Sequence, residues 1–187
     1  MTKHFNTFWL ISVAVLLSSL LVFPQWLNRD AVATFLESLG SMAFAVYIVV
    51  SLLRATVMLP ATPFVLAGAI SFPDSLMAVF MVSILGIMAG ALLLYSFPSF
   101  GGYDIYLESK YPRQIHKIRK KMASPYAYWF IAGWSSFPLV PTDAICYVAG
   151  LAKMSARKVA AAVLMGEIPI VAFYIFVGVE ISECLRT

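Results

Sequence analysis

Long hydrophobic runs alternate along this chain with short polar segments. Residues 8–23 carry no charge and lead to Trp26, so their length and the interfacial tryptophan predict a first membrane-spanning helix. A cleaved signal peptide is the alternative, but no small-residue cleavage pattern precedes Arg29. Residues 28–40 place charged and apolar side chains at helical spacing, which predicts an amphipathic helix on the membrane surface that ends at Gly40.

Prolines interrupt the next hydrophobic stretch. An apolar run over residues 41–59 is followed by Pro60, Pro63 and Pro73 in a segment that otherwise stays apolar. Proline lacks a backbone N–H and breaks helical continuity, and broken backbone at membrane depth needs protein or a water-filled cavity to satisfy its polar groups. The pattern therefore predicts a re-entrant hairpin over residues 59–73.

Two further hydrophobic blocks flank the strongly polar part of the chain. Residues 74–95 have the length and composition of a spanning helix. Residues 103–122 mix charged and apolar side chains, which predicts two surface-lying helices divided by Pro112. A second proline-broken block, residues 126–150, precedes a last predicted helix over residues 155–180.

Two parts of the chain share one spacing of prolines and a tyrosine. The matching residues are Pro60, Pro63 and Tyr95 in the first copy, and Pro138, Pro141 and Tyr174 in the second. The interval from the second proline to the tyrosine is 32 residues in the first copy (63 to 95) and 33 in the second (141 to 174). Chance stays open as an explanation, because these residue types are frequent in membrane helices.

The charge pattern suggests how the two copies run through the membrane. If the basic clusters at residues 110–121 and 153–158 lie on one side, the helix at 74–95 runs towards that side and the helix at 155–180 runs away from it. Repeats of opposite orientation place a binding site near the bilayer midplane in secondary transporters.

The predicted fold is an all-α polytopic membrane protein with two inverted repeats, each a re-entrant proline-broken hairpin followed by a spanning helix. Residues 1–187 form a single membrane domain in this prediction. Its parts are the N-terminal spanning and amphipathic helices (1–40), the first repeat (41–100), a basic amphipathic linker (101–125) and the second repeat (126–187).

Composition supports a lipid environment. Of the 187 residues 61% are hydrophobic and only 12% are charged, whereas about a quarter of the residues of a soluble domain are charged. The net charge of +4 arises from 13 basic and 9 acidic residues. Much of the basic excess lies at residues 110–121, and in so apolar a chain it indicates a role at the membrane surface rather than nucleic-acid binding.

Catalytic and metal-binding patterns are not found in the sequence. The two histidines, His4 and His116, lie in polar flanks, and Cys146 and Cys184 have no CxxC spacing. An intramembrane enzyme is the alternative. We expect that the protein is not an enzyme and that it binds no cofactor and no metal.

Charged and polar side chains inside hydrophobic segments are the candidate functional residues. An ionisable group in a spanning segment costs roughly 2.5–3.5 kcal/mol on insertion scales, so it usually faces protein or water. With the prolines and two serines of the broken segments, the candidates for the translocation path are Arg54, Pro60, Pro63, Ser135, Ser136, Pro138, Pro141, Asp143 and Glu167.

The charged candidates also have plain structural interpretations. Arg54 is either a ligand for a phosphate or a side chain that reaches the membrane surface from near a helix end. Asp143 either caps the helix that follows Pro141 or lines the path. Glu167 is expected to be functional or paired, with Arg54 or Lys158 as partner.

The two proline-containing segments resemble the DedA/VTT superfamily, also called SNARE-associated Golgi proteins. Residues 54–95 (RATVMLPATPFVLAGAISF…GIMAGALLLY) are similar to its first hairpin and helix, and residues 137–169 (FPLVPTDAICYVAGLAKMSARKVAAAVLMGEIP) to its second. Ser135 stands where many members carry an arginine, and Cys146 where one branch has asparagine. Arg54 stands near an acidic position of the proton-linked members, which argues against coupling through those residues.

The resemblance implies a membrane translocator that moves a lipid headgroup or a small solute, as a flippase, a scramblase or a transporter does. Membrane lipids, including anionic and polyprenyl-phosphate lipids, are the implied partners, and a bacterial inner membrane is the implied location. A homo-oligomer is left open. The alternative is a non-transporting membrane scaffold whose basic helices bind anionic lipid.

Overall fold

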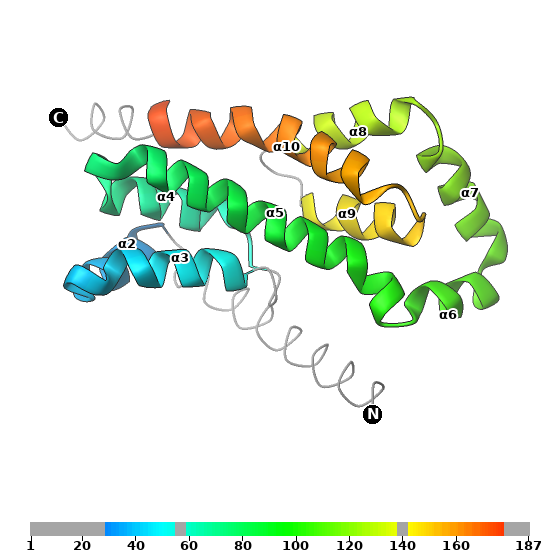
Figure 1. Ribbon diagram of the computed structural model, residues 1–187, viewed down its shortest axis with the longest axis horizontal. Helices are drawn as coiled ribbons and strands as arrows, with labels where there is room; N and C mark the ends of the chain where they lie inside the picture. The colour runs from blue at the N-terminus through cyan, green and yellow to red at the C-terminus, as the bar shows by residue number, and fades with distance from the viewer. Residues whose placement is uncertain (1–28, 55–58, 138–141, 178–187) are drawn as a thin grey trace. The chain divides into compact units, whose positions relative to one another are not determined.

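The computed structural model describes residues 29–54, 59–137 and 142–177, and every element formed by these residues is helical (Figure 1). They divide into two compact units. The first contains the described residues up to Ile87 together with those from Val171 onward, and the second runs from Met88 to Ile170. The first predicted spanning helix, over residues 8–23, lies outside the described residues.

The first unit begins with helix α2 (Arg29–Ser38) and helix α3 (Ala43–Leu53), joined through the 3-10 turn η2 (Gly40–Met42). Gly40 has φ +54°, a left-handed conformation that favours glycine. A helix was predicted over residues 28–40, and residues 29–38 form one, with Gly40 in the turn that follows it. The expected position of this helix on the membrane surface stays a prediction. Helix α4 (Ala61–Ser71), the turn η4 (Pro73–Ser75) and the first part of helix α5 (Leu76–Phe100) follow.

Tyr47 on α3 organises the packing of the first unit. Its ring is 1% exposed and lies against Gly68 of α4, where an added Cβ would meet the ring at 2.5 Å. Its hydroxyl shares a 3.0 Å hydrogen bond with Ser83 of α5. The side chains of Phe44 and Phe72 lie next to the same ring.

Pro60 and Pro63 lie at the start of helix α4 and do not interrupt it. Helix α4 is continuous from Ala61, with Pro60 as the residue before it and Pro63 as its third residue. The first backbone N–H groups of a helix have no intrahelical acceptor, so a proline there loses no hydrogen bond. The break expected at Pro63 is therefore wrong. Pro60 directly precedes α4 and Pro73 follows it, so the predicted interruptions at these two prolines are seen, and the re-entrant path of the segment stays a prediction.

The second unit contains the end of α5, helix α6 (Tyr103–Lys110), helix α7 (Pro112–Met122), helix α8 (Tyr126–Ser135), helix α9 (Thr142–Leu151) and most of helix α10 (Ala156–Ala172). Pro112 is the first residue of α7, which confirms the predicted division of residues 103–122 into two helices. Pro138 and Pro141 lie outside the described residues.

A close approach of backbones joins α9 to α5. A Cβ at Gly150 would collide with the backbone carbonyl oxygen of Tyr95, and its next neighbours are Tyr95 backbone atoms as well. The Tyr95 hydroxyl donates a 2.5 Å hydrogen bond to the carbonyl of Met154, just after α9. The end of α9 is therefore held to α5 at two points.

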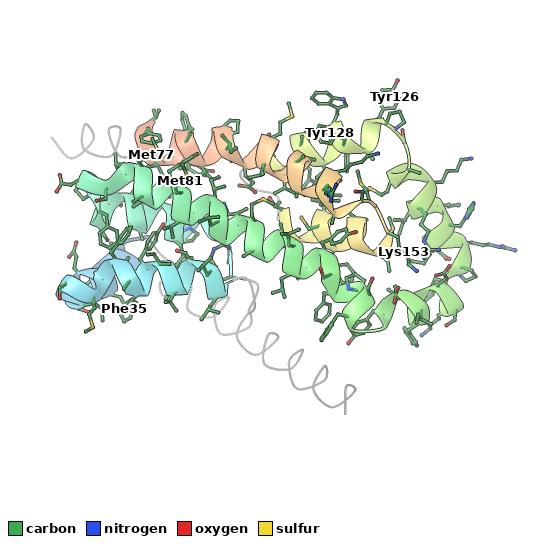
Figure 2. All side chains as sticks on the ribbon, viewed as in Figure 1. Phe35, Met77, Met81, Tyr126, Tyr128 and Lys153 are labelled. Carbon is green, nitrogen blue, oxygen red and sulfur yellow. The ribbon has the colours of Figure 1, made fainter. Side chains whose placement is uncertain are left out.

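Within the part of the chain that the structure describes, two helices are long and apolar enough to cross a membrane, Pro73–Phe100 and Ala156–Val177. They match the spanning helices predicted over residues 74–95 and 155–180. Large apolar side chains lie exposed on the first of them, as Figure 2 shows for Met77 and Met81, and such a surface is compatible with lipid. The other apolar helices of the described residues, including α4 and α9, are shorter.

Pro169 does not end the second long helix. Helix α10 continues through it to Ala172 and then widens into a π-helical turn, η5 (Phe173–Val177). A proline removes one backbone donor from a helix, and π-helical turns are a known way of accommodating a local mismatch in a helix. The helix therefore continues past Pro169 and changes to a π-helical turn at Phe173, four residues later.

Candidate functional site

Glu167 lies inside the second unit with a hydrogen-bonded carboxylate. It is 9% exposed and is carried by α10. The hydroxyl of Thr142, the first residue of α9, donates a 2.6 Å hydrogen bond to its Oε1 atom. A buried carboxylate is costly unless it is hydrogen-bonded, so this contact explains in part why the side chain is tolerated here.

Gly166 brings the end of α8 next to this carboxylate. A Cβ at Gly166 would collide with the carbonyl oxygen of Ala132 and would lie 2.7 Å from Cβ of Ser135. Ser135 is 2% exposed, and its hydroxyl oxygen has no hydrogen-bond partner within the described part of the chain. We call Ser135, Thr142 and Glu167 the Glu167 cluster.

Asp143 and Cys146 lie beside the Glu167 cluster on α9. Asp143 is in the first turn of that helix and is half-buried, a position where a carboxylate interacts favourably with the helix dipole. The buried thiol of Cys146 lies within electrostatic range of the carboxylates of both Asp143 and Glu167. The structure thus gathers acidic and hydroxyl groups around one end of α9.

Ser136 differs from its neighbour Ser135. It follows the last residue of α8 and is exposed, and its hydroxyl donates a 2.9 Å hydrogen bond to the carbonyl of Ala132. The same carbonyl also accepts the backbone N–H of Ser136, so the hydroxyl adds a second bond at the end of α8 and Ser136 has a local structural role.

Arg54 belongs to the first unit. It is 7% exposed, follows the last residue of α3, and donates a 2.9 Å hydrogen bond from Nη1 to the carbonyl of Leu59. Tyr47 lies within its electrostatic range. Arg54 therefore supports the connection from α3 to α4, where Pro60 is exposed and Pro63 half-buried.

Two ion pairs, Arg119–Glu108 and Lys153–Asp104, connect polar segments of the second unit. Arg119 of α7 forms two hydrogen bonds with the carboxylate of Glu108 on α6, Nη1 to Oε1 at 2.6 Å and Nη2 to Oε2 at 2.8 Å. Lys153, which has φ +58°, places Nζ 3.6 Å from Oδ2 of the buried Asp104. The Arg119 guanidinium lowers the pKa of the Glu108 carboxyl, so that group stays ionised near neutral pH.

The sequence did not predict the Thr142 hydroxyl as a partner of Glu167, and the expected pairing of Glu167 with Arg54 or Lys158 stays a prediction. Thr142 stands between Pro141 and Asp143. A threonine directly after a proline at the expected start of a helix was the signal that could have pointed to it. The Tyr47–Ser83 hydrogen bond was also missed, because uncharged polar residues in apolar helices carry little signal about their partners.

Comparison with known proteins supports the resemblance found in the sequence. The family model of the VTT domain matches residues 59–180, a range that includes α4, α5, the polar helices and the Glu167 cluster. No curated protein and no solved structure gave a significant match. The chain therefore belongs to the VTT-domain family of membrane proteins, that is, the DedA/SNARE-associated Golgi protein family.

Proposed function

We propose that the protein moves a lipid headgroup or a small anionic solute across its membrane, and that the Glu167 cluster is part of the path. The observation that carries this proposal is the buried Glu167 carboxylate, bonded to Thr142 next to a Ser135 hydroxyl that has no partner among the described residues. A buried hydroxyl without a partner is costly at membrane depth unless water or a ligand reaches it. A passing polar group would give the Ser135 hydroxyl a partner.

Helix length supports a membrane-embedded position for α4 and α9. They contain 11 and 10 residues, which correspond to about 16 Å and 15 Å at the usual rise per residue. The hydrocarbon core is about 30 Å thick. A helix of this length that starts at the membrane surface ends near the midplane. We propose that α4 and α9 are each one arm of a re-entrant segment.

Matching internal packing supports a repeat made of α3–α4–α5 and α8–α9–α10. In each triplet a glycine of the long helix lies against a backbone carbonyl near the end of the first helix: Gly86 against Ser51, and Gly166 against Ala132. The proposal that the two triplets have opposite orientations in the membrane rests on the charge pattern of the sequence. Arg54 and Ser136 occupy corresponding positions after α3 and α8.

The proposal is tested by movement of labelled lipids between leaflets. Vesicles containing a headgroup-labelled phospholipid are treated with a membrane-impermeant quencher, which in empty vesicles bleaches only the outer leaflet. We expect the wild-type protein to expose the inner-leaflet label. Thr142→Val should slow this exposure several-fold, because it keeps the side-chain shape and removes the hydroxyl that Glu167 accepts from.

The matched control is Thr34→Val, the same change at an exposed position of α2, which should leave the rate unchanged. Labelled phospholipids of several headgroups and a small phosphorylated solute extend the assay to the substrate classes proposed. If wild-type vesicles behaved as empty ones with all of them, transport would be rejected in favour of a membrane scaffold.

A further inference from the structure

Helix α7 has two chemically distinct faces. At 100° per residue its cationic side chains, except Arg119, fall on one face and its apolar ones on the other. The basic face, which we call the basic stripe, consists of Arg113, His116, Lys117, Lys120 and Lys121. The opposite face carries Ile115, Ile118 and Met122, of which Ile115 is only 4% exposed.

The direction of the basic stripe is fixed by contacts on the other side of α7. The helix packs against α9, and Arg119 is held on its flank by the two hydrogen bonds to Glu108. A bidentate arginine–carboxylate pair restrains orientation as well as distance. Every member of the stripe is exposed.

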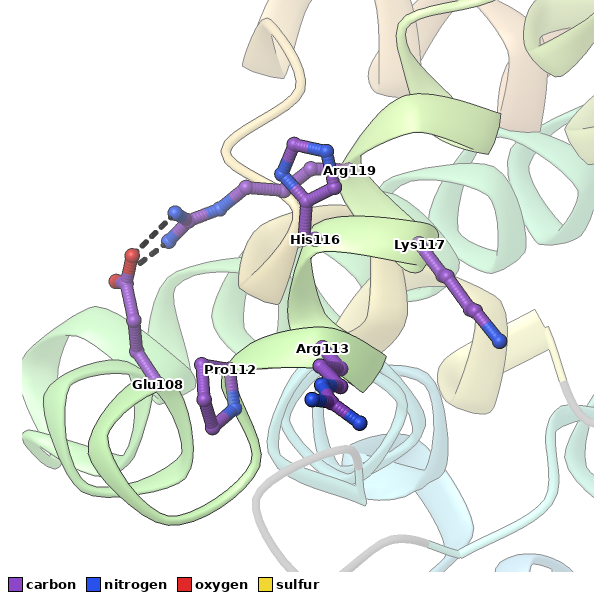
Figure 3. A pocket seen from close by; sticks show the side chains of 6 residues that line it. All are labelled: Glu108, Pro112, Arg113, His116, Lys117 and Arg119. Carbon is purple, nitrogen blue, oxygen red and sulfur yellow. Dashed lines mark hydrogen bonds and ion pairs between the residues drawn. The ribbon is translucent and has the colours of Figure 1, made fainter.

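The lysines and the arginine of the stripe are not paired with any residue that the structure describes. Within the described residues, Arg113, Lys117, Lys120 and Lys121 form no hydrogen bond or ion pair, and α7 itself contains no acidic residue. An open groove of about 540 Å³ is lined by Pro112, Arg113, His116 and Lys117 together with the Glu108–Arg119 pair. Figure 3 shows the paired groups on one side of this groove, with Arg113 and Lys117 pointing away from them.

Exposed aromatic and aliphatic side chains precede and follow α7 in the chain. Before α7 they include Ile105, Tyr106 and Tyr111, and after it Tyr126 and Trp129. Lys110 lies 5.5 Å from the ring centres of both Tyr106 and Tyr111. Tyrosine and tryptophan with neighbouring lysines are typical of the lipid headgroup layer, and α6 begins just after the spanning helix that ends at Phe100.

We propose that the basic stripe of α7 binds the phosphate groups of anionic phospholipids in the leaflet that it faces. The guanidinium of Arg113 and the ammonium of Lys117, one turn apart on the groove, supply the donors for one lipid phosphate. The exposed Ile105 and the position of α6 directly after the spanning helix favour a lipid surface over a nucleic acid. This site is separate from the Glu167 cluster and goes beyond the proposed transport.

Native mass spectrometry of the full-length protein tests the stripe. The protein is extracted from vesicles of equal parts phosphatidylglycerol and phosphatidylcholine, and the bound lipids are counted. We expect the wild type to retain phosphatidylglycerol preferentially. One lysine or arginine near an anionic surface contributes the equivalent of about a fivefold affinity change, so Arg113→Gln with Lys117→Gln should lower the ratio of bound phosphatidylglycerol to phosphatidylcholine about tenfold or more.

Two further variants separate site binding from general attraction. Arg157→Gln with Lys158→Gln removes the same charge from exposed positions at the start of α10 and should change the ratio less than twofold. Arg113→Lys with Lys117→Arg keeps both charges and should retain most of the preference for phosphatidylglycerol. This variant also shows whether substitution at these two positions by itself disturbs folding.

Three results would overturn the proposal. The first is a wild-type protein that shows no preference for phosphatidylglycerol. The second is an Arg157/Lys158 variant that loses as much of this preference as the Arg113/Lys117 variant. The third is a short DNA duplex that displaces the bound lipid at a lower concentration than added phosphatidylglycerol does. A normal leaflet-exchange rate in a variant that has lost lipid retention would leave transport standing and confirm that the two sites are independent.

Discussion

Replacing Glu167 by glutamine is expected to reduce lipid or solute movement at least tenfold while leaving the stability of the folded protein close to that of the wild type. Glutamine has nearly the shape of glutamate and can still accept the hydrogen bond from the Thr142 hydroxyl. It removes the negative charge that the proposed path uses. Loss of activity without loss of stability is the mark of a functional group rather than a structural one.

The effect is measured by leaflet exchange together with thermal unfolding in detergent. Glu37→Gln, the same change at an exposed position of α2, is the matched control and should alter neither quantity. Glu167→Gln with full activity would remove the carboxylate from the mechanism. A large fall in melting temperature would assign it a structural role instead.

Gly150→Ala is expected to be the most damaging single methyl addition in the second unit. The new Cβ would overlap the Tyr95 carbonyl oxygen and would lie 2.8 Å from the Tyr95 carbonyl carbon. These are backbone atoms of α5, so no side-chain rotation relieves the clash. Overpacking typically costs 1–3 kcal/mol and occasionally more, and we expect about 3 kcal/mol here, with much less folded protein recovered after extraction.

Gly133→Ala provides the control for this substitution. Gly133 lies inside α8, is exposed, and has no atom within 4 Å of the position where a Cβ would be added. Alanine is favoured over glycine in a helix by about 0.8–1.0 kcal/mol, so this variant should be as stable as the wild type or slightly more so. Equal melting temperatures for the two variants would contradict the close approach of α9 and α5.

The long helices and the polar linker could be predicted because their signals lie in short stretches of the sequence. Runs of apolar residues determine the two spanning candidates, and the charge pattern of residues 103–122 with Pro112 determines the split into α6 and α7. The effect of Pro63 could not be predicted in this way. Proline breaks a helix interior but not a first turn, and the sequence does not tell which of the two it occupies.

The candidate site was predicted in part for a similar reason. Glu167 stands out because a charge in an apolar helix is rare, whereas its partner Thr142 is an ordinary residue until the fold places it 2.6 Å from the carboxylate. The Lys153–Asp104 and Arg119–Glu108 pairs join different helices. Pairing between helices depends on tertiary packing, which periodicity does not encode.

Thiol accessibility in the intact membrane tests most directly whether water reaches the Glu167 cluster. In a background of Cys146→Ala and Cys184→Ala, single cysteines are placed at Thr142 and at Leu85, an exposed residue of the spanning helix Pro73–Phe100. A charged, membrane-impermeant thiol reagent is predicted to modify Thr142→Cys at least ten times faster than Leu85→Cys. Equal and negligible modification of both in the membrane, with rapid modification of Thr142→Cys after unfolding in detergent, would contradict a wet path at this cluster.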